Sequence, residues 1–224
     1  MSLTADYSTG RKLYRHAEKR LPSVSMIVSE LTGERFEGVP LDSLLKACLE
    51  GTGAHRLACN IALLRAGHLS AVDVLPLPDD YPAPAEEWFQ AMGRAEKDIH
   101  ECFNRHQIEP IAVEQRSICT AYNFAGQPDM MAELTWKGKR VRAVIDYKRV
   151  QALSIGNYLQ VCAYRMLDAY ISCRKGFILW LKKEGGWKLV PVEYNPHNTA
   201  ALLGTAVVLN WRIANGLLNI RDGW

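Results

Sequence analysis

The sequence predicts an α/β protein, of the α+β kind, with a central mixed β-sheet that is flanked by helices and preceded by a helical N-terminal region. Helical patterns fill residues 1–109, β-branched runs begin after Pro110, and the later segments follow the order three strands, helix, two strands, helix. That order is typical of helices packed on a mixed sheet. We expect a single domain over 1–224, divided into a helical part at 1–109, a sheet with one helix at 110–195 and a C-terminal helix at 196–224.

Three stretches account for the helical part. Residues 40–50 and 53–67 carry stripes of Leu, Ile and Ala, and we expect a break or kink between them, near Gly51 and Gly53. After a proline-rich connection, residues 85–107 predict a long helix. Its acidic residues come early and its basic residues late, which suits the helix dipole.

The strands of the predicted sheet come from five apolar segments. Residues 111–120, 124–136 and 139–149 each read as one strand, and 176–181 and 187–194 read as a hairpin around a Gly-rich turn. Because short connections join consecutive segments, the second and third strands are expected to pair as a hairpin as well.

Two helices complete the pattern. Residues 153–171 are amphipathic, and 195–216 carry a full set of end signals: Asn195 as N-cap, Pro196 at the first position and Gly216 at the end. The apolar stripe of the first of these helices consists of Ile155, Leu159, Cys162 and Met166.

Composition indicates a globular protein. The chain has 224 residues, 48% hydrophobic and 23% charged, and a net charge of +3. It contains no apolar run long enough to span a membrane and no apolar signal segment at its start, so we expect a cytoplasmic protein without membrane contact. The six cysteines include no C-x-x-C pair. Their spacing predicts reduced, buried thiols and neither a zinc nor an iron–sulfur site.

Two acids and a lysine stand inside otherwise apolar strands. If Lys137 and Gly138 form a two-residue loop, Asp129 lies opposite Asp146, and a loop one or two residues longer makes the pair diagonal. Either register puts the two carboxylates on one sheet face, roughly 4.5–8 Å apart. Lys148 shares that face because it follows Asp146 by two positions.

Like charges at such a distance destabilise a sheet, and two arrangements relieve the repulsion. Lys148 can neutralise the acids as a structural ion cluster, or a divalent cation can bind between Asp129 and Asp146. Gln160 and Tyr164, spaced by four, share a face of the following helix, either as a boundary-facing pair or turned towards the acids.

The order of these motifs resembles the PD-(D/E)XK nuclease superfamily, and within it the RecB-like and phage exonuclease branch. The resemblance rests on Gly126-x-x-Asp129, on Asp146-Tyr147-Lys148, on Gln160-x-x-x-Tyr164 and on "GTGAH", which ends at His55. It covers residues from Leu21 to about Tyr194, and each motif alone is weak. It implies a restriction-endonuclease-like core.

The resemblance also implies roles for the motif residues. Asp129 and Asp146, the carbonyl of Tyr147 and His55 are expected to bind one or two Mg²⁺ or Mn²⁺ ions, and Lys148 to orient the attacking water. Gln160 and Tyr164 are expected to hold the DNA backbone or support the metal ligands. Glu114, placed on the first strand, is carried over as a catalytic candidate whose role stays open. The protonation state of Lys148 stays open too, and action as the general base is the alternative role for it.

The implied activity is metal-dependent hydrolysis of DNA, as a phage or prophage exonuclease in recombination or replication. A structure-specific endonuclease and an inactive DNA-binding scaffold are the alternatives. The chain has no GxxxxGK[ST] motif, so ATP is not expected, and it lacks the cysteine cluster of iron–sulfur relatives. A strand-annealing partner and an oligomer are compatible with the resemblance, although no residue specifies either. The DNA-contacting cations are expected at the hairpin tip, as Lys137, Lys139, Arg140 and Arg142.

Overall fold

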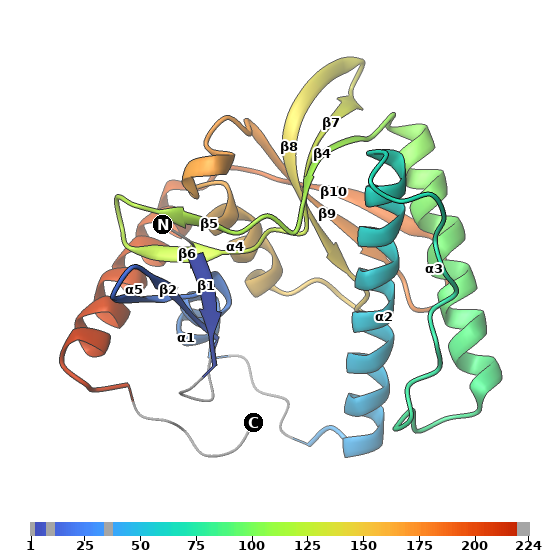
Figure 1. Ribbon diagram of the computed structural model, residues 1–224, viewed down its shortest axis with the longest axis horizontal. Coiled ribbons are helices and arrows are strands. Elements are labelled where there is room, and N and C mark those ends of the chain that lie inside the picture. The colour runs from blue at the N-terminus through green and yellow to red at the C-terminus, as the bar shows by residue number, and fades with distance from the viewer. Residues whose placement is uncertain (1–2, 8–11, 34–37, 219–224) are drawn as a thin grey trace.

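The computed structural model describes residues 3–7, 12–33 and 38–218, and its centre is a five-stranded mixed sheet flanked by helices (Figure 1). The strand order is β10-β9-β8-β7-β4, in which β8 and β9 are parallel and the other neighbours antiparallel. This confirms the predicted fold class. The five strands are β4 (Glu109–Val113), β7 (Met130–Trp136), β8 (Lys139–Lys148), β9 (Lys175–Leu181) and β10 (Trp187–Val192).

Helices cover both faces of this sheet. Two long helices, α2 and α3, pack on one face, and three shorter ones, α1, α4 and α5, pack on the other (Figure 1). A one-turn 3₁₀ helix, η1, covers Asp168–Tyr170. None of the described helices is both long enough and apolar enough to cross a membrane. The helices are α1 (Val24–Thr32), α2 (Leu41–Arg65), α3 (Ala85–Arg105), α4 (Ile155–Tyr164) and α5 (Pro196–Ala214).

The β7–β8 hairpin has the predicted two-residue loop. Met130 pairs with Ile145 and Trp136 with Lys139, which leaves only Lys137 and Gly138 unpaired. Their φ angles are 49° and 76°. Two consecutive left-handed residues form the tight turn whose twist matches that of the flanking strands. The register therefore continues towards Asp129 and Asp146 as the sequence predicted.

The helix at residues 41–65 is continuous, so the expected break near Gly51 and Gly53 is wrong. Gly53 serves close packing instead of ending the helix. A Cβ at this position would lie 2.5 Å from a ring carbon of Trp88 and 2.9 Å from the sulfur of Met92, both on α3. The glycine thus lets α2 approach α3 more closely than any larger residue permits.

The first 22 residues differ from the expected helical region. Within the described ranges they form a three-stranded antiparallel sheet, and the helical region begins only after it. Each strand has four residues, too few to display a recognisable alternation, and Leu13 and Tyr14 are consecutive yet both buried. The strands are β1 (Leu3–Asp6), β2 (Leu13–His16) and β3 (Lys19–Pro22).

Two predicted strands are each split in the structure. The segment 111–120 breaks at Glu114, whose φ of 50° ends β4, and the segment 124–136 breaks at 127–129. The two fragments nearest the breaks pair with each other as a separate two-stranded sheet. These fragments are β5 (Ser117–Cys119) and β6 (Phe124–Gly126). Glu114 therefore follows a strand and does not lie within one, which corrects its predicted placement.

The predicted end signals of α5 are confirmed, whereas α4 is shorter than the predicted helix. In α5, the side-chain oxygen of Asn195 accepts hydrogen bonds from the amides of His197 and Asn198, and Gly216 has a φ of 66° just beyond the helix, as predicted. The helix ends at Ala214, so its expected continuation is wrong for residues 215–218, and residues 219–224 lie outside the described residues. In α4, Ile155 is exposed and the helix stops before Met166, so only Leu159 and Cys162 of the predicted stripe are buried helical residues. Ile155 is the first residue of the helix.

All six cysteines are free, as expected. Five are buried, and Cys48 on α2 is exposed.

Candidate metal centre

His55 lies on α2 and is close to Cys59 on the same helix and to two acids that are far away in sequence. Its Nε2 is 3.1 Å from Oε1 of Glu114 and 3.6 Å from Sγ of Cys59, which stands one helical turn later. Its Nδ1 is 3.4 Å from Oδ2 of Asp129. Both ring nitrogens therefore face candidate ligand atoms. The hydrogen bond to Asp129, followed by that to Cys59, raises the pKa of His55 to about 11 although burial opposes it.

Asp129 connects this histidine to the strand of the second acid. Its Oδ2 accepts a hydrogen bond of 2.6 Å from the backbone amide of Tyr147, and its backbone carbonyl accepts one of 2.9 Å from the amide of Glu114. Asp129 is buried and stands immediately before β7. Its carboxylate is thus held at the end of β8, beside Asp146.

Glu114 reaches His55 through an unusual backbone conformation. Its φ of 50° is left-handed, which is uncommon for a residue with a long side chain. The conformation ends β4 and aims the carboxylate at Nε2 of His55. Backbone strain of this kind persists only where surrounding contacts enforce it, and it is concentrated at functional sites.

Asp146 is fully buried on β8. Nζ of Lys148 lies 2.5 Å from its Oδ2, yet neither carboxylate oxygen accepts a hydrogen bond of ordinary geometry from the described residues. Burial raises the pKa of Asp146 to about 7, the Lys148 charge opposes the rise and Asp129 adds to it. Burial alone lowers the pKa of Lys148, but the charges of Asp146 and Asp129 outweigh it and raise that pKa, which favours the ammonium form.

Tyr164, the second residue of the polar pair on α4, lies close enough to the two acids for their charges to act on it. Nε2 of Gln160 donates a hydrogen bond of 2.8 Å to the hydroxyl of Tyr164. The Tyr164 ring is buried and close to Gly126, where an added Cβ would come within 3.0 Å of the ring. Burial, followed by the charges of Asp146 and Asp129, raises the pKa of Tyr164 well above its usual value.

The donor atoms form two groups that Asp129 joins. His55, Cys59 and Glu114 offer ligand atoms that all lie within 4.8 Å of one another, and Asp146 is not part of that described group. Asp146 and Lys148 form the second group. A cation shared by Asp129 and Asp146, with the Tyr147 carbonyl as a further ligand, stays a prediction.

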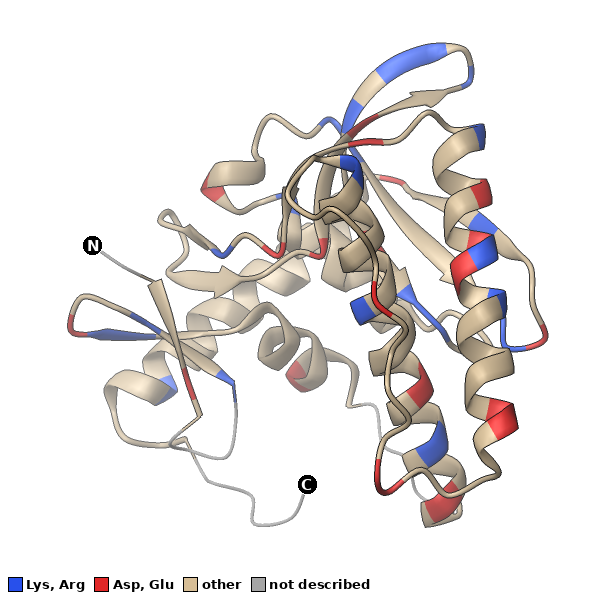
Figure 2. Cartoon of the chain, turned by 45° about the vertical axis from the view of Figure 1, so that its right-hand side comes forward, with Lys and Arg blue, Asp and Glu red and all other residues tan. Residues whose placement is uncertain are grey.

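The four cations predicted to contact DNA lie at the other end of the strands. From Lys139 to Asp146 the strand runs seven positions, about 23 Å at 3.3 Å per residue. Figure 2 shows the basic residues gathered along the projecting β7–β8 hairpin. Arg140 pairs with Glu109 at 2.8 Å, and Arg142 pairs with Glu133 at 3.0 Å. The hairpin cations, which also include Lys137, are therefore not brought to the acid cluster.

Two other cations, missed by the sequence analysis, stand beside it. Nε of Arg116 donates a hydrogen bond of 3.0 Å to Oε1 of Gln127, so that this pair flanks Glu114 and Asp129. Lys12, just before β2, is close enough for Arg116, Glu114 and Asp129 to act on its pKa, which burial lowers. The spacing of Arg116 two positions after Glu114 is a signal that sequence reasoning could have used.

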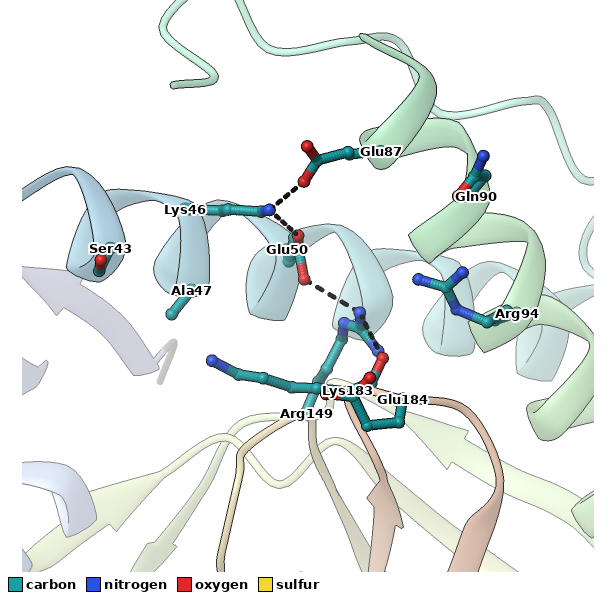
Figure 3. Close-up of a pocket in the computed structure, with 10 residues that line it drawn as sticks. All are labelled: Ser43, Lys46, Ala47, Glu50, Glu87, Gln90, Arg94, Arg149, Lys183 and Glu184. Atoms are coloured by element: carbon teal, nitrogen blue, oxygen red, sulfur yellow. Dashed lines mark hydrogen bonds and ion pairs between the residues drawn. The ribbon is translucent and has the colours of Figure 1, made fainter. Parts of the chain in front are cut away.

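A cavity of about 420 Å³ lies between α2, α3 and the β9–β10 turn (Figure 3). Arg149, the residue after Lys148, crosses it to Oε2 of Glu50 on α2 at 2.9 Å. The other carboxylate oxygen of Glu50 accepts a hydrogen bond of 2.8 Å from the hydroxyl of Tyr81. This buried contact ties the helix that carries His55 to the strand that carries Asp146.

No protein-family model and no curated protein matches the chain. Among solved structures, it is similar to a "Putative exonuclease" from Eubacterium rectale, with 14% identity, a TM-score of 0.47, and coverage of 98% of this chain and 89% of that one. It is also similar to the protein SSO0001, with 14% identity, a TM-score of 0.32, and coverage of 71% and 75%. Both TM-scores are below 0.5, and the two likenesses say nothing about the activity of this chain.

Proposed function

We propose that the chain is a deoxyribonuclease that uses Mg²⁺ or Mn²⁺ to hydrolyse phosphodiester bonds in DNA. The observation that carries the proposal is the Asp146 carboxylate. It is fully buried, lies beside a second acid, and accepts no hydrogen bond of ordinary geometry from the described residues. Nζ of Lys148, 2.5 Å from Oδ2, offsets one negative charge of the Asp129 and Asp146 pair, and a divalent cation would compensate the second.

The residues around Asp146 fit a hard divalent cation. Carboxylate oxygens are the ligands that Mg²⁺ prefers, and Asp129 and Asp146 supply them at one end of the strands. His55, held against Asp129 at 3.4 Å, supplies a nitrogen from the opposite wall. When bound, the cation lowers the pKa of a water molecule and offsets charge on the phosphate.

The remaining roles belong to side chains of the chain itself. The ammonium of Lys148 holds the attacking water and stabilises charge that grows on the scissile phosphate. Burial lowers the pKa of Lys148 and the charges of Asp146 and Asp129 raise it, and the net rise favours the ammonium form that this role needs. Gln160 fixes the Tyr164 ring against the cluster, and Glu114 orients His55.

Two sets of basic residues are candidate contacts for the phosphate backbone of the substrate, and we call each set a track. Lys12 and Arg116 flank the acid cluster, whereas Lys137, Lys139, Arg140 and Arg142 lie on the hairpin, four to nine positions before Asp146. We place the scissile phosphate at the first track, since an arginine fork matches a phosphate and Arg116 is exposed there. The hairpin cations can contact a more distant stretch of the same DNA.

Three finer assignments come from the family resemblance alone. They are digestion from a free end, a phage or prophage origin, and a role in recombination or replication. A strand-annealing partner and an oligomeric ring rest on the same resemblance.

Cleavage of linear and covalently closed circular DNA, with Mg²⁺ and with Mn²⁺, tests the proposal. We expect the wild type to degrade linear DNA and to spare closed circles, and Asp146→Asn to be inactive yet folded by circular dichroism. Degradation of closed circles would replace the exonuclease by an endonuclease. Absence of metal-dependent cleavage in every DNA form would leave a DNA-binding scaffold.

A further inference from the structure

The two distances from Nε2 of His55 to Glu114 and to Cys59 are close to those of a zinc site. Tetrahedral zinc with Zn–N, Zn–O and Zn–S bonds of about 2.0, 2.0 and 2.3 Å separates nitrogen from oxygen by about 3.3 Å and nitrogen from sulfur by about 3.5 Å. The observed separations from Nε2 are 3.1 Å to Oε1 of Glu114 and 3.6 Å to Sγ of Cys59. The third edge, from oxygen to sulfur, is within 4.8 Å.

The orientation of the imidazole is that of a metal ligand. A ligating histidine usually donates its other ring N–H to a carboxylate, and Nδ1 of His55 faces Oδ2 of Asp129 at 3.4 Å. Nε2 carries at most one proton but faces both the Cys59 thiol and the Glu114 carboxylate. It therefore cannot donate a full hydrogen bond to both groups at once. One cation in front of Nε2 contacts all three.

The surroundings supply a path for entry and an open position. The side chains of His55 and Glu114 are 34% and 46% exposed, whereas Cys59 is buried beneath them. Three protein ligands and a solvent-facing fourth position are the arrangement of zinc sites that keep an exchangeable ligand. The left-handed Glu114 backbone is the strained element that completes the triad.

We propose that His55, Cys59 and Glu114 form a binding site for a thiophilic divalent cation of the zinc class. A thiolate selects such a cation over Mg²⁺, which prefers oxygen. On binding, the Cys59 thiol and the His55 imidazolium release protons to solvent, so that the cation meets a thiolate, a neutral imidazole and a carboxylate. The site does not depend on nuclease activity. A consequence that rests on the proposed function is competition with the Mg²⁺ or Mn²⁺ centre for His55.

Direct metal binding without DNA separates this proposal from the nuclease proposal. Chelator-stripped full-length protein is titrated with Co²⁺, whose thiolate complexes have a strong charge-transfer band, and with Zn²⁺ in competition with a chromophoric chelator. We expect one cation per chain and a cobalt–thiolate band. Cys59→Ser should lose the band and weaken Zn²⁺ binding by about tenfold or more, since even outer partners of metal sites are worth about 10–100-fold.

Cys48→Ser is the matched control, because Cys48 is an exposed cysteine on the same helix. It should keep both the band and the affinity. Glu114→Gln should keep the band and bind Zn²⁺ more weakly. The proposal is overturned if wild-type protein gives no thiolate band, which needs no variant to fold, or if Cys59→Ser or Glu114→Gln binds Zn²⁺ like the wild type.

Discussion

Replacing Arg149 with methionine should lower the free energy of unfolding by about 3 kcal/mol. The Arg149 and Glu50 side chains are only 3% and 10% exposed, and their contact of 2.9 Å joins residues 99 positions apart (Figure 3). Arg149 also donates to the carbonyls of Lys182 and Lys183 at 3.2 and 3.5 Å. Methionine fills much of the space but leaves the Glu50 carboxylate buried without its cation.

The magnitude follows from what Glu50 retains. Removing one partner of a buried ion pair costs about 3–5 kcal/mol, because the other charge stays uncompensated. The hydroxyl of Tyr81 still donates to Glu50, and Lys46 lies 4.0 Å away, so the lower end of that range applies. For a chain of this length, about 3 kcal/mol corresponds to a fall of about 6–12 °C in melting temperature.

Urea denaturation, followed by circular dichroism, measures this change. Arg212→Met is the matched control, since it removes an arginine–glutamate contact of 2.6 Å whose side chains are 40% and 32% exposed, and it should cost less than about 1 kcal/mol. Adding Glu50→Gln to Arg149→Met should recover part of the loss, because the orphaned charge disappears. Equal costs for the two arginine variants would refute the reasoning, as would a double variant no more stable than Arg149→Met.

Three further outcomes follow from the same contacts. Gly53→Ala should destabilise the fold by about 1–3 kcal/mol, because its Cβ would lie 2.5 Å from the ring of Trp88 on α3. Gly51→Ala should stabilise the fold by up to about 1 kcal/mol, because its Cβ would meet no neighbouring element within 4 Å. Thermal melts measure both changes. Mn²⁺ at a hundredfold excess over Kd should stabilise the wild type by about 2.7 kcal/mol, and Asp129→Asn should abolish that increment while its amide oxygen still accepts the β8 hydrogen bond. In filter-binding assays with duplex DNA, Arg116→Gln should lower the slope of log affinity against log salt by about 1, and Arg142→Gln, paired with Glu133, should change it less.

Local signals account for the parts of the fold that the sequence predicted. The turn at Lys137 and Gly138 needs only two residues that accept left-handed angles, and it determines the register of the whole hairpin. The caps of α5 likewise depend on Asn195 and Pro196 and their immediate neighbours. Such features need no knowledge of the rest of the chain.

The sequence did not predict features of the fold that depend on contacts with residues far away along the chain. The glycine at position 53 reads as a helix breaker until Trp88 is known to lie against it. The break at Glu114 depends on a backbone hydrogen bond to Asp129, fifteen positions later, and no periodicity reports it. The N-terminal strands are too short for alternation to show. In the first two cases a tertiary contact overrides the local preference.

The candidate site combines both kinds of information. Asp146 and Lys148 share a face because strand residues alternate, which the sequence contains. His55 joins them only because α2 packs across the sheet. The ion pair between Arg149 and Glu50 stabilises that packing. Arg149 directly follows Lys148, and Glu50 precedes His55 by five residues. A helix rises 1.5 Å per residue, so Glu50 and His55 are about 7.5 Å apart along the axis of α2. A slip of α2 by one turn would therefore remove His55 from Asp129, and the buried ion pair opposes such a slip most directly.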